Sequence, residues 1–251
     1  MGKTLVWAHR GASGYAPENT LEAFQKAIDL KADGIELDVQ MTKDGKLVII
    51  HDERVNRVSD GKGWVKDFTF DEIRKLNFNK KFPEYGRVKI PTLEEVYQLV
   101  KNTDLLINVE IKSGIVFYEN IEEKVMDLTD KMGLKDRVLY SSFNHYTILK
   151  LKKLDPSVKT GFLYQDGYID MPEYAKKHGV EALHPALYNL QYPDFVKKCK
   201  DYNILIRAWT VNEEKYMRMV CDYGIEGIIT NYPDVALKIV KEYENRNISK
   251  E

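Results

Sequence analysis

The chain has 251 residues, of which 43% are hydrophobic and 31% are charged, and its formal net charge is -1. This length and apolar content are typical of a globular protein with a sizeable core, and the balanced charge excludes an overall attraction to nucleic acid or to an anionic membrane. The N-terminus lacks the basic start and apolar run of a signal peptide, and no stretch of about 18 apolar residues predicts a membrane span. We therefore expect a soluble, cytoplasmic protein.

Short apolar runs alternate with segments of helical period along most of the chain. Eight of these runs are interpreted as strands, and each is followed by a helical segment. The expected strands are residues 5–9, 34–41, 105–111, 138–142, 159–164, 181–185, 204–210 and 227–230. This pattern predicts an α/β protein with a (β/α)₈ TIM barrel. A doubly wound open sheet is the alternative, but no G-x-G-x-x-G motif follows the first strand.

An antiparallel hairpin is expected over residues 34–52, because the second strand is followed by an Asp-Gly pair at 44–45 and by a return strand rich in β-branched residues. Counting with period two places Glu36 and Asp38 on one face and apolar residues on the other. A two-residue loop at the Asp-Gly pair would set Asp38 opposite His51, whereas a four-residue loop would set Glu36 opposite His51. Both registers place His51 on the acidic face.

Residues 53–91 interrupt the alternation, since a loop between a strand and a helix usually has about 2 to 6 residues. We expect an insertion within a single catalytic domain that spans residues 1–251. It contains one short helix with a T-x-x-E capping box at 69–72, and it ends where a second such box, at 92–95, begins the next helix. Because the insertion follows the return strand, it should cover the barrel end that carries the acids, either as a structural lid or as a cap that selects substrates.

Three carboxylates come from neighbouring strands of the expected barrel. Glu36 and Asp38 belong to the second strand, and Glu110 belongs to the third, where it shares a face with Asn108 and Lys112. The carboxyl ends of barrel strands carry the chemistry of this fold. Three inward-facing acids at one level repel one another, and a hard divalent ion such as Mg²⁺ or Ca²⁺ relieves that repulsion. The sequence therefore predicts a metal site at this end of the barrel.

Basic and aromatic residues lie at the same strand ends. His9 ends the first strand and is a candidate acid or base, because it adjoins the strand of the first two acids. Arg10 and Lys112 supply positive charge at the same rim, which together with a cation indicates phosphate binding. Phe143 and Trp209 follow or end later strands and are candidates for contacts with an organic group.

The remaining histidines give weaker signals. His145 begins a helical segment and His178 ends one, so both are interpreted as helix-terminal or solvated residues. His184 closes the sixth strand and faces either the site or a loop.

Six short motifs together resemble those of the glycerophosphodiester phosphodiesterase family. They are HRG at 9–11, PENT at 17–20, ELD at 36–38, TKDG at 42–45, HD at 51–52 and EIK at 110–112. The resemblance extends to AWTVN at 208–212 and covers nearly the whole chain. It implies a phosphatidylinositol-phospholipase-like barrel with an insertion after the second strand. It also implies an enzyme, a phosphoric diester hydrolase, that converts glycerophosphodiesters such as glycerophosphocholine or glycerophosphoethanolamine to glycerol 3-phosphate and an alcohol.

The resemblance implies a role for each matching residue. The implied metal ligands are Glu36, Asp38 and Glu110, the implied acid-base pair is His9 and His51, and the implied phosphate contacts are Arg10 and Lys112. Glu18 and Asn19 of the PENT motif also match, but their spacing indicates mainly a helix N-cap, Asn19-x-x-Glu22, after Pro17.

The expected mechanism divides the chemistry between the two histidines. His9 would deprotonate the glycerol 2-hydroxyl, His51 would protonate the departing alcohol, and water would then open a cyclic phosphate with the roles reversed. A lysophospholipase D that shares the site is an alternative, which requires an apolar cleft or a membrane-touching surface. A non-catalytic barrel is disfavoured because no site residue is missing, and an amidohydrolase is disfavoured because the first strand lacks H-x-H. The oligomeric state and the preferred alcohol are left open.

Overall fold

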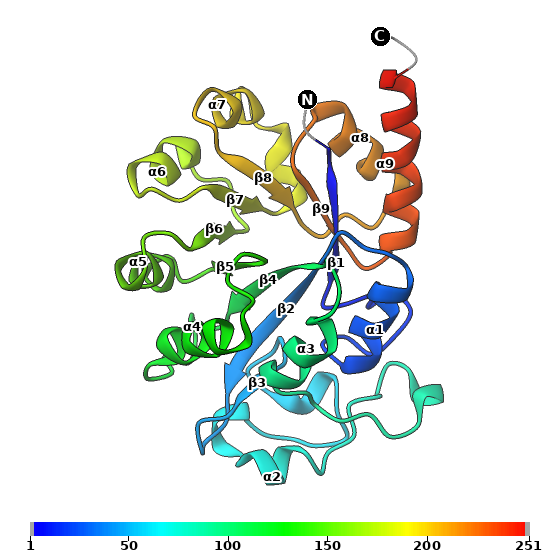
Figure 1. Cartoon of the computed structure of the whole chain (residues 1–251), viewed down its shortest axis with the longest axis vertical. Coiled ribbons are helices and arrows are strands. Elements are labelled where there is room, and N and C mark those ends of the chain that lie inside the picture. The colour runs from blue at the N-terminus through cyan, green and yellow to red at the C-terminus, as the bar shows by residue number, and fades with distance from the viewer. Residues whose placement is uncertain (1–2, 249–251) are drawn as a thin grey trace.

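The computed structural model describes residues 3–248, so the ends of the predicted domain at residues 1–2 and 249–251 lie outside the described part. Eight parallel strands form a closed barrel in this part of the chain, because β1 pairs with both β2 and β9 (Figure 1). The strands are β1 (Leu5–His9), β2 (Gly34–Met41), β4 (Leu106–Ile111), β5 (Val138–Ser142), β6 (Lys159–Tyr164), β7 (Ala182–Pro185), β8 (Leu205–Ala208) and β9 (Gly227–Thr230). The predicted TIM barrel is confirmed.

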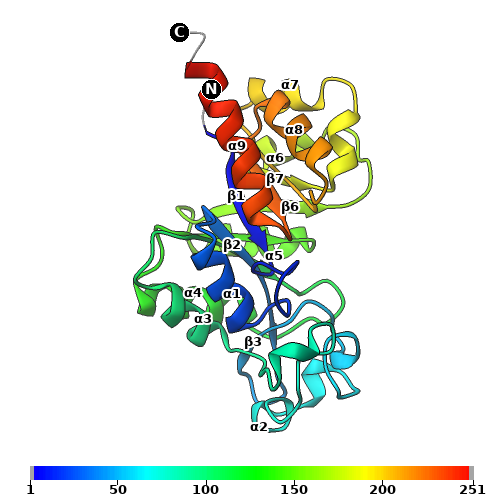
Figure 2. The same cartoon turned by 90° about the vertical axis from the view of Figure 1, so that its right-hand side faces the viewer.

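Helices follow the strands and cover the outside of the barrel (Figures 1 and 2). They are α1 (Leu21–Asp29), α3 (Leu93–Val100), α4 (Ile121–Met132), α5 (His145–Leu154), α6 (Met171–Lys177), α7 (Phe195–Asp201), α8 (Glu214–Tyr223) and α9 (Pro233–Ile248). Alternate residues of each strand have different surroundings, as the period of a strand requires. On β1, Val6 and Ala8 belong to the large apolar core shared with the helices, whereas Trp7 between them lies in a small cluster with Leu139 and Ile229.

The hairpin between β2 and β3 (Leu47–Ile49) has a register that differs from both predicted ones. Val39 pairs with Ile49, which leaves a three-residue loop at 43–45. Gly45 adopts φ +80° at the end of this loop, and a three-residue hairpin loop needs such a left-handed residue. Both predicted registers were therefore wrong. His51 still reaches the acidic side, because β3 ends at Ile49 and the chain bends at residues 51–53.

The segment 53–91 contains α2 (Phe70–Ile73) and three short 3₁₀ helices, η1 (Val55–Arg57), η2 (Val65–Asp67) and η3 (Pro83–Tyr85). It packs on the return strand in an apolar cluster separate from the main core, which consists of Val48, Ile50, Val55, Val65, Ile73, Phe78, Val88 and Ile90. Both predicted capping boxes are present, at the starts of α2 and α3. In Figure 1 the segment lies beside β3, at the end where β2 terminates.

No helix among residues 3–248 has the length and apolar character needed to cross a bilayer.

Candidate active site

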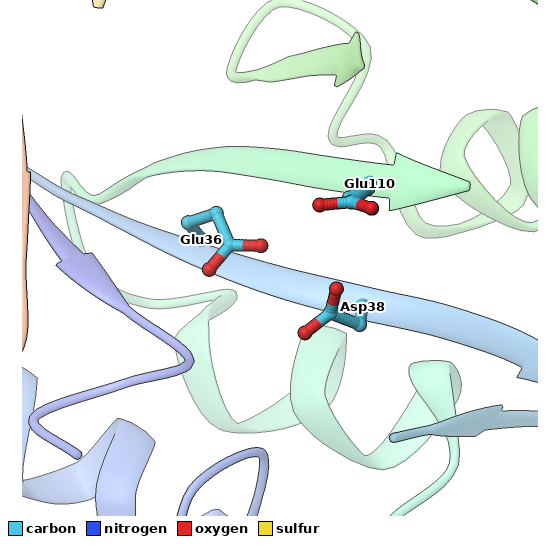
Figure 3. A group of neighbouring side chains, drawn as sticks. All are labelled: Glu36, Asp38 and Glu110. Carbon is cyan, nitrogen blue, oxygen red and sulfur yellow. The ribbon is translucent and has the colours of Figure 1, made fainter. Parts of the chain in front are cut away.

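Three buried carboxylates converge at adjacent strands of the barrel. Glu36 and Asp38 project from β2, and Glu110 projects from β4, where it is the register partner of Asp38. One oxygen of each lies within 4.8 Å of one oxygen of the others. Figure 3 shows the three carboxyl groups directed into one shared space. The structure therefore brings together all three acids that the sequence predicted as metal ligands.

Electrostatics in this cluster favour a bound cation. Burial and the negative charges of Asp38 and Glu110 raise the pKa of Glu36 well above its ordinary value. Burial also raises the pKa of Glu110, although a neighbouring lysine opposes this shift. Burial acts in the same direction at Asp38, but the positive charges of His51 and Arg10 outweigh it and hold the pKa of Asp38 below its ordinary value. The buried Oδ1 of Asp38 has no hydrogen-bond partner among the described residues, so the donor set fits a hard divalent ion.

The PENT segment orients Asp38, and the residue that caps the next helix differs from the predicted one. Thr20, not Asn19, caps α1 by accepting a hydrogen bond from the Ala23 amide. Asn19 adopts φ +58°, and its side-chain amide donates to Asp38 Oδ2 at 2.8 Å. The prediction failed because an Asn one residue before a Thr matches the same capping pattern. Glu18 accepts a hydrogen bond at 2.8 Å from Arg10 and therefore also belongs to the site.

The turn after β1 shapes the other side of the cluster. Arg10 has φ +56°, and its backbone amide donates to Glu36 Oε2 at 2.9 Å. Gly11 follows with φ +77°, and a Cβ at this position would lie 2.6 Å from the carbonyl carbon of Ala23. The glycine of the H-R-G motif is thus required by the backbone geometry that turns the Arg10 amide toward the acid.

Each of the two predicted catalytic histidines has a different hydrogen-bond partner. His9 Nδ1 lies 2.7 Å from Asn231 Oδ1, and since an amide oxygen only accepts, Nδ1 carries the proton. Burial and the charge of Arg10 lower the pKa of His9 to about 3. His51 Nδ1 instead lies 2.7 Å from a carboxylate oxygen of Asp52, whose other oxygen accepts from Arg57 at 2.7 Å.

A side chain of β2, that of Gln40, holds the loop that carries His51. Gln40 Nε2 donates to the carbonyl oxygens of Ile50, His51 and Asp52 at 2.8 to 3.1 Å. The amide oxygen of Gln40 accepts from the Tyr118 hydroxyl at 2.9 Å. This buried amide explains how His51 is positioned after the strand has ended.

A cavity of about 390 Å³ is lined by both histidines and by two of the three clustered acids, Glu36 and Glu110, whereas Asp38 is fully buried beside them. Its walls comprise His9, Arg10, Glu36, His51, Glu53, Asn108, Glu110, Lys112, Ile115, Phe143, Leu163, Gln165, Trp209 and Ile229. Lys112 donates to Glu110 at 2.8 Å and lies over the Phe143 ring at 5.7 Å. Phe143 and Trp209 pack edge to face, with ring centroids 5.6 Å apart. All four predicted substrate-binding residues therefore line the same cavity.

The other three histidines lie outside this cavity. His184 is fully buried inside the barrel, where Arg207 donates to its Nε2 at 3.1 Å. His145 is the first residue of α5, and its Nε2 donates to the Leu163 carbonyl at 2.9 Å. His178 follows the last residue of α6, as predicted.

Comparison with known proteins identifies the family. Residues 9–235 match the model of the "Glycerophosphoryl diester phosphodiesterase family". The chain belongs to the glycerophosphodiester phosphodiesterase family. A glycerophosphodiester phosphodiesterase of Caldanaerobacter subterraneus subsp. tengcongensis is 46% identical, over 96% of this chain and 99% of the relative. One of Bacillus altitudinis is 40% identical, over 95% and 99%. The sequence resemblance is confirmed, and the chain is a phosphoric diester hydrolase that acts on glycerophosphodiesters.

Solved structures of phosphodiesterases share the barrel. The enzyme of Thermotoga maritima is 30% identical with a TM-score of 0.79, over 95% of this chain and 99% of that one. An Oleispira antarctica phosphodiesterase is 26% identical with a TM-score of 0.83, over 95% and 97%, and its structure contains the product sn-glycerol-3-phosphate.

Sequence reasoning missed three residues of this candidate active site. Asn231, the partner of His9, directly follows β9, and its position at a strand end is a signal that could have found it. Asp52 stands next to His51 in the H-D motif. Gln40 continues the period of Glu36 and Asp38 along the acidic face of β2.

Proposed function

We propose that this enzyme hydrolyses glycerophosphodiesters such as glycerophosphocholine and glycerophosphoethanolamine to glycerol 3-phosphate and the free alcohol, with a divalent ion and two histidines. The observation that carries the proposal is one cavity lined by two histidines with different partners and by two members, Glu36 and Glu110, of a three-carboxylate cluster. The product held by the Oleispira relative is consistent with this substrate class.

Glu36, Asp38 and Glu110 would hold the ion, Mg²⁺ or Ca²⁺. When bound, it would neutralise negative charge on the phosphodiester and polarise the phosphoryl group. Two hydrogen bonds would hold these ligands in place for the ion. The Asn19 side-chain amide donates to Asp38, and the Arg10 backbone amide donates to Glu36. These contacts fix the ligand oxygens without occupying the buried Oδ1 of Asp38.

His9 is suited to act as the base. Its proton is directed to Asn231, which leaves the lone pair on Nε2, and its low pKa keeps the ring neutral at physiological pH. We propose that Nε2 removes the proton of the glycerol 2-hydroxyl as that oxygen attacks phosphorus. The attack breaks the bond from phosphorus to the alcohol oxygen and forms a five-membered cyclic phosphate.

His51 is suited to act as the acid. The Asp52 carboxylate, 2.7 Å from Nδ1, fixes the orientation of the imidazole ring, so that Nε2 is the nitrogen that would exchange a proton with the substrate. We propose that His51 gives its proton to the departing alkoxide. In the second step, His51 takes a proton from water as the water attacks the cyclic phosphate, and His9 returns a proton to the 2-hydroxyl oxygen.

Positive and aromatic side chains would position the substrate. Arg10 and Lys112 lie at the cavity wall, and we propose that they contact the phosphate although each already donates to an acid, Glu18 and Glu110 respectively. Phe143 and Trp209 would contact the carbon atoms of glycerol.

The test of the whole proposal is an assay of glycerol 3-phosphate release from glycerophosphoethanolamine. Release of a different phosphate ester would reject it.

Loss of either histidine of the proposed pair is expected to lower kcat by roughly 10²-fold or more, the usual scale for a positioned acid or base. The variants are His9→Ala and His51→Ala, measured at saturating substrate. His145→Ala and His178→Ala are matched controls outside the cavity and should leave kcat within about twofold. Near-normal kcat in either of the first two variants would give that histidine a structural role.

Lysophospholipase D activity is a second candidate, and a specific cavity favours it. A second cavity, of about 600 Å³, adjoins the site and shares Phe143, Leu163 and Gln165 with it. Its wall continues to Ile169, whose side chain is 89% exposed, so an acyl chain on the glycerol would find apolar contacts there.

A comparison of 1-acyl lysophosphatidylcholine with glycerophosphocholine tests this candidate. If the acyl chain occupies the second cavity, Ile169→Asp should lower kcat/KM for the lysophospholipid by about fivefold or more, because it places a charge against the chain. Glycerophosphocholine should be unaffected. No turnover of the lysophospholipid by the unaltered enzyme would exclude the activity.

A further inference from the structure

Glu53 differs from the other charged residues of the catalytic cavity. The side chains of Arg10, Lys112 and His51 each contact a carboxylate, at 2.8, 2.8 and 2.7 Å. Glu53 lines the same cavity and is only partly exposed, yet its carboxylate has no ion pair or hydrogen bond among residues 3–248. It is also not one of the three clustered acids. Its negative charge is thus available to a ligand.

Neighbouring groups do not neutralise Glu53. The hydroxyl of Tyr118 donates to the Gln40 amide oxygen instead. Burial, and after it the charge of Glu53, raise the pKa of Tyr118. Arg54, the next residue, has its guanidinium over the Trp64 ring at 5.1 Å. Glu53 therefore lines the cavity without an ion pair to any of the described residues.

The position of Glu53 in the chain places it near the end of the substrate that would carry the departing alcohol. It lies two residues after His51, the group that would protonate the departing alcohol, and Ile115 lines the same cavity with a side chain that is 67% exposed. We infer that Glu53 recognises a positively charged group on the departing alcohol, and so directs the enzyme toward glycerophosphodiesters of amino alcohols. This inference rests on the proposed function, because it takes the alcohol end from the role of His51.

Choline and ethanolamine both carry a cation two carbons from the oxygen that leaves phosphorus. A carboxylate near that position attracts the cation in the ground state and in the transition state alike, so the expected effect is mainly on KM. Because Glu53 is partly exposed, solvent and salt weaken the attraction. Loss of the Glu53 charge should therefore raise KM by about fivefold.

The experiment compares three substrates in the metal-loaded enzyme: glycerophosphocholine, its uncharged isostere with a 3,3-dimethylbutyl group, and glycerophosphoglycerol. Glu53→Gln keeps the shape of the side chain and removes its charge. It should raise KM about fivefold for glycerophosphocholine only, and high salt should produce a similar loss in the unaltered enzyme. Glu84→Gln is the matched control, since Glu84 belongs to the same inserted segment, is exposed and lies outside the cavity wall.

Two results would overturn the inference. An equal change for all three substrates would show that Glu53 acts on the site in general, and weaker Mg²⁺ binding by Glu53→Gln in calorimetry would assign it to the metal. The proposed function is tested separately by the unaltered enzyme, because failure to release glycerol 3-phosphate from any of the three diesters would reject that proposal and not the role of Glu53 alone.

Discussion

Removal of divalent ions with EDTA is expected to reduce hydrolysis to the background rate, and added Mg²⁺ or Ca²⁺ should restore it. Three buried carboxylates lie within 4.8 Å of one another, and burial together with mutual repulsion raises the pKa of two of them. Without an ion, the cluster must take up protons or lose its geometry. The measurement is glycerol 3-phosphate release after chelation and after titration with each ion. Full activity in chelated, metal-free enzyme would contradict the prediction.

Glu110→Ala provides a variant for the same prediction. It should weaken ion binding in calorimetry, while the thermal transition of the metal-free protein changes little, because relief of repulsion offsets the lost contact with Lys112. Glu84→Ala removes an exposed carboxylate outside the cavity and should leave ion binding unchanged. A large fall in the transition temperature of Glu110→Ala without metal would instead indicate a structural role for the cluster.

The barrel could be predicted because its signals are periodic and local. Eight apolar runs with helical segments between them suffice for the closed sheet, and two capping boxes located the starts of α2 and α3. The hairpin register could not be predicted in the same way. Asp44-Gly45 suits loops of two, three or four residues, and the choice depends on contacts with a distant segment: the Asp44 carboxylate accepts from the Phe70 amide at 3.0 Å.

The site was predictable where parallel strands lie side by side. Glu36, Asp38 and Glu110 occupy one face of β2 and β4, so their meeting follows from period and strand order. The residues that form hydrogen bonds to the site residues were harder to predict. Asn231 lies 222 positions from His9 in the chain and carries no charge. Asn19 matched a helix-cap pattern equally well, and only its φ of +58° and its contact with Asp38 show its function.

A glycerophosphodiester that lacks the glycerol 2-hydroxyl is expected to bind but to turn over roughly 10³-fold more slowly or worse. If the 2-hydroxyl attacks phosphorus, the substrate supplies its own nucleophile at a high effective concentration, and its removal leaves only intermolecular attack. The phosphate contacts proposed for Arg10 and Lys112 do not involve this hydroxyl, so the 2-deoxy analogue should still inhibit competitively. The measurement is kcat for 2-deoxy-glycerophosphoethanolamine and for the natural diester.

The comparison must use kcat, because the missing hydroxyl could also remove a binding contact and thereby raise KM. Similar kcat values for the two diesters would mean that water attacks directly, and His9 would then be a base for water. Early accumulation of glycerol 1,2-cyclic phosphate from the natural diester would support attack by the hydroxyl.

His51→Ala offers an independent check on the same step. The variant should regain turnover on a diester whose alcohol is a good leaving group, such as a nitrophenol, because such an alcohol departs without a proton, whereas His9→Ala should remain slow on that substrate because the 2-hydroxyl still needs a base.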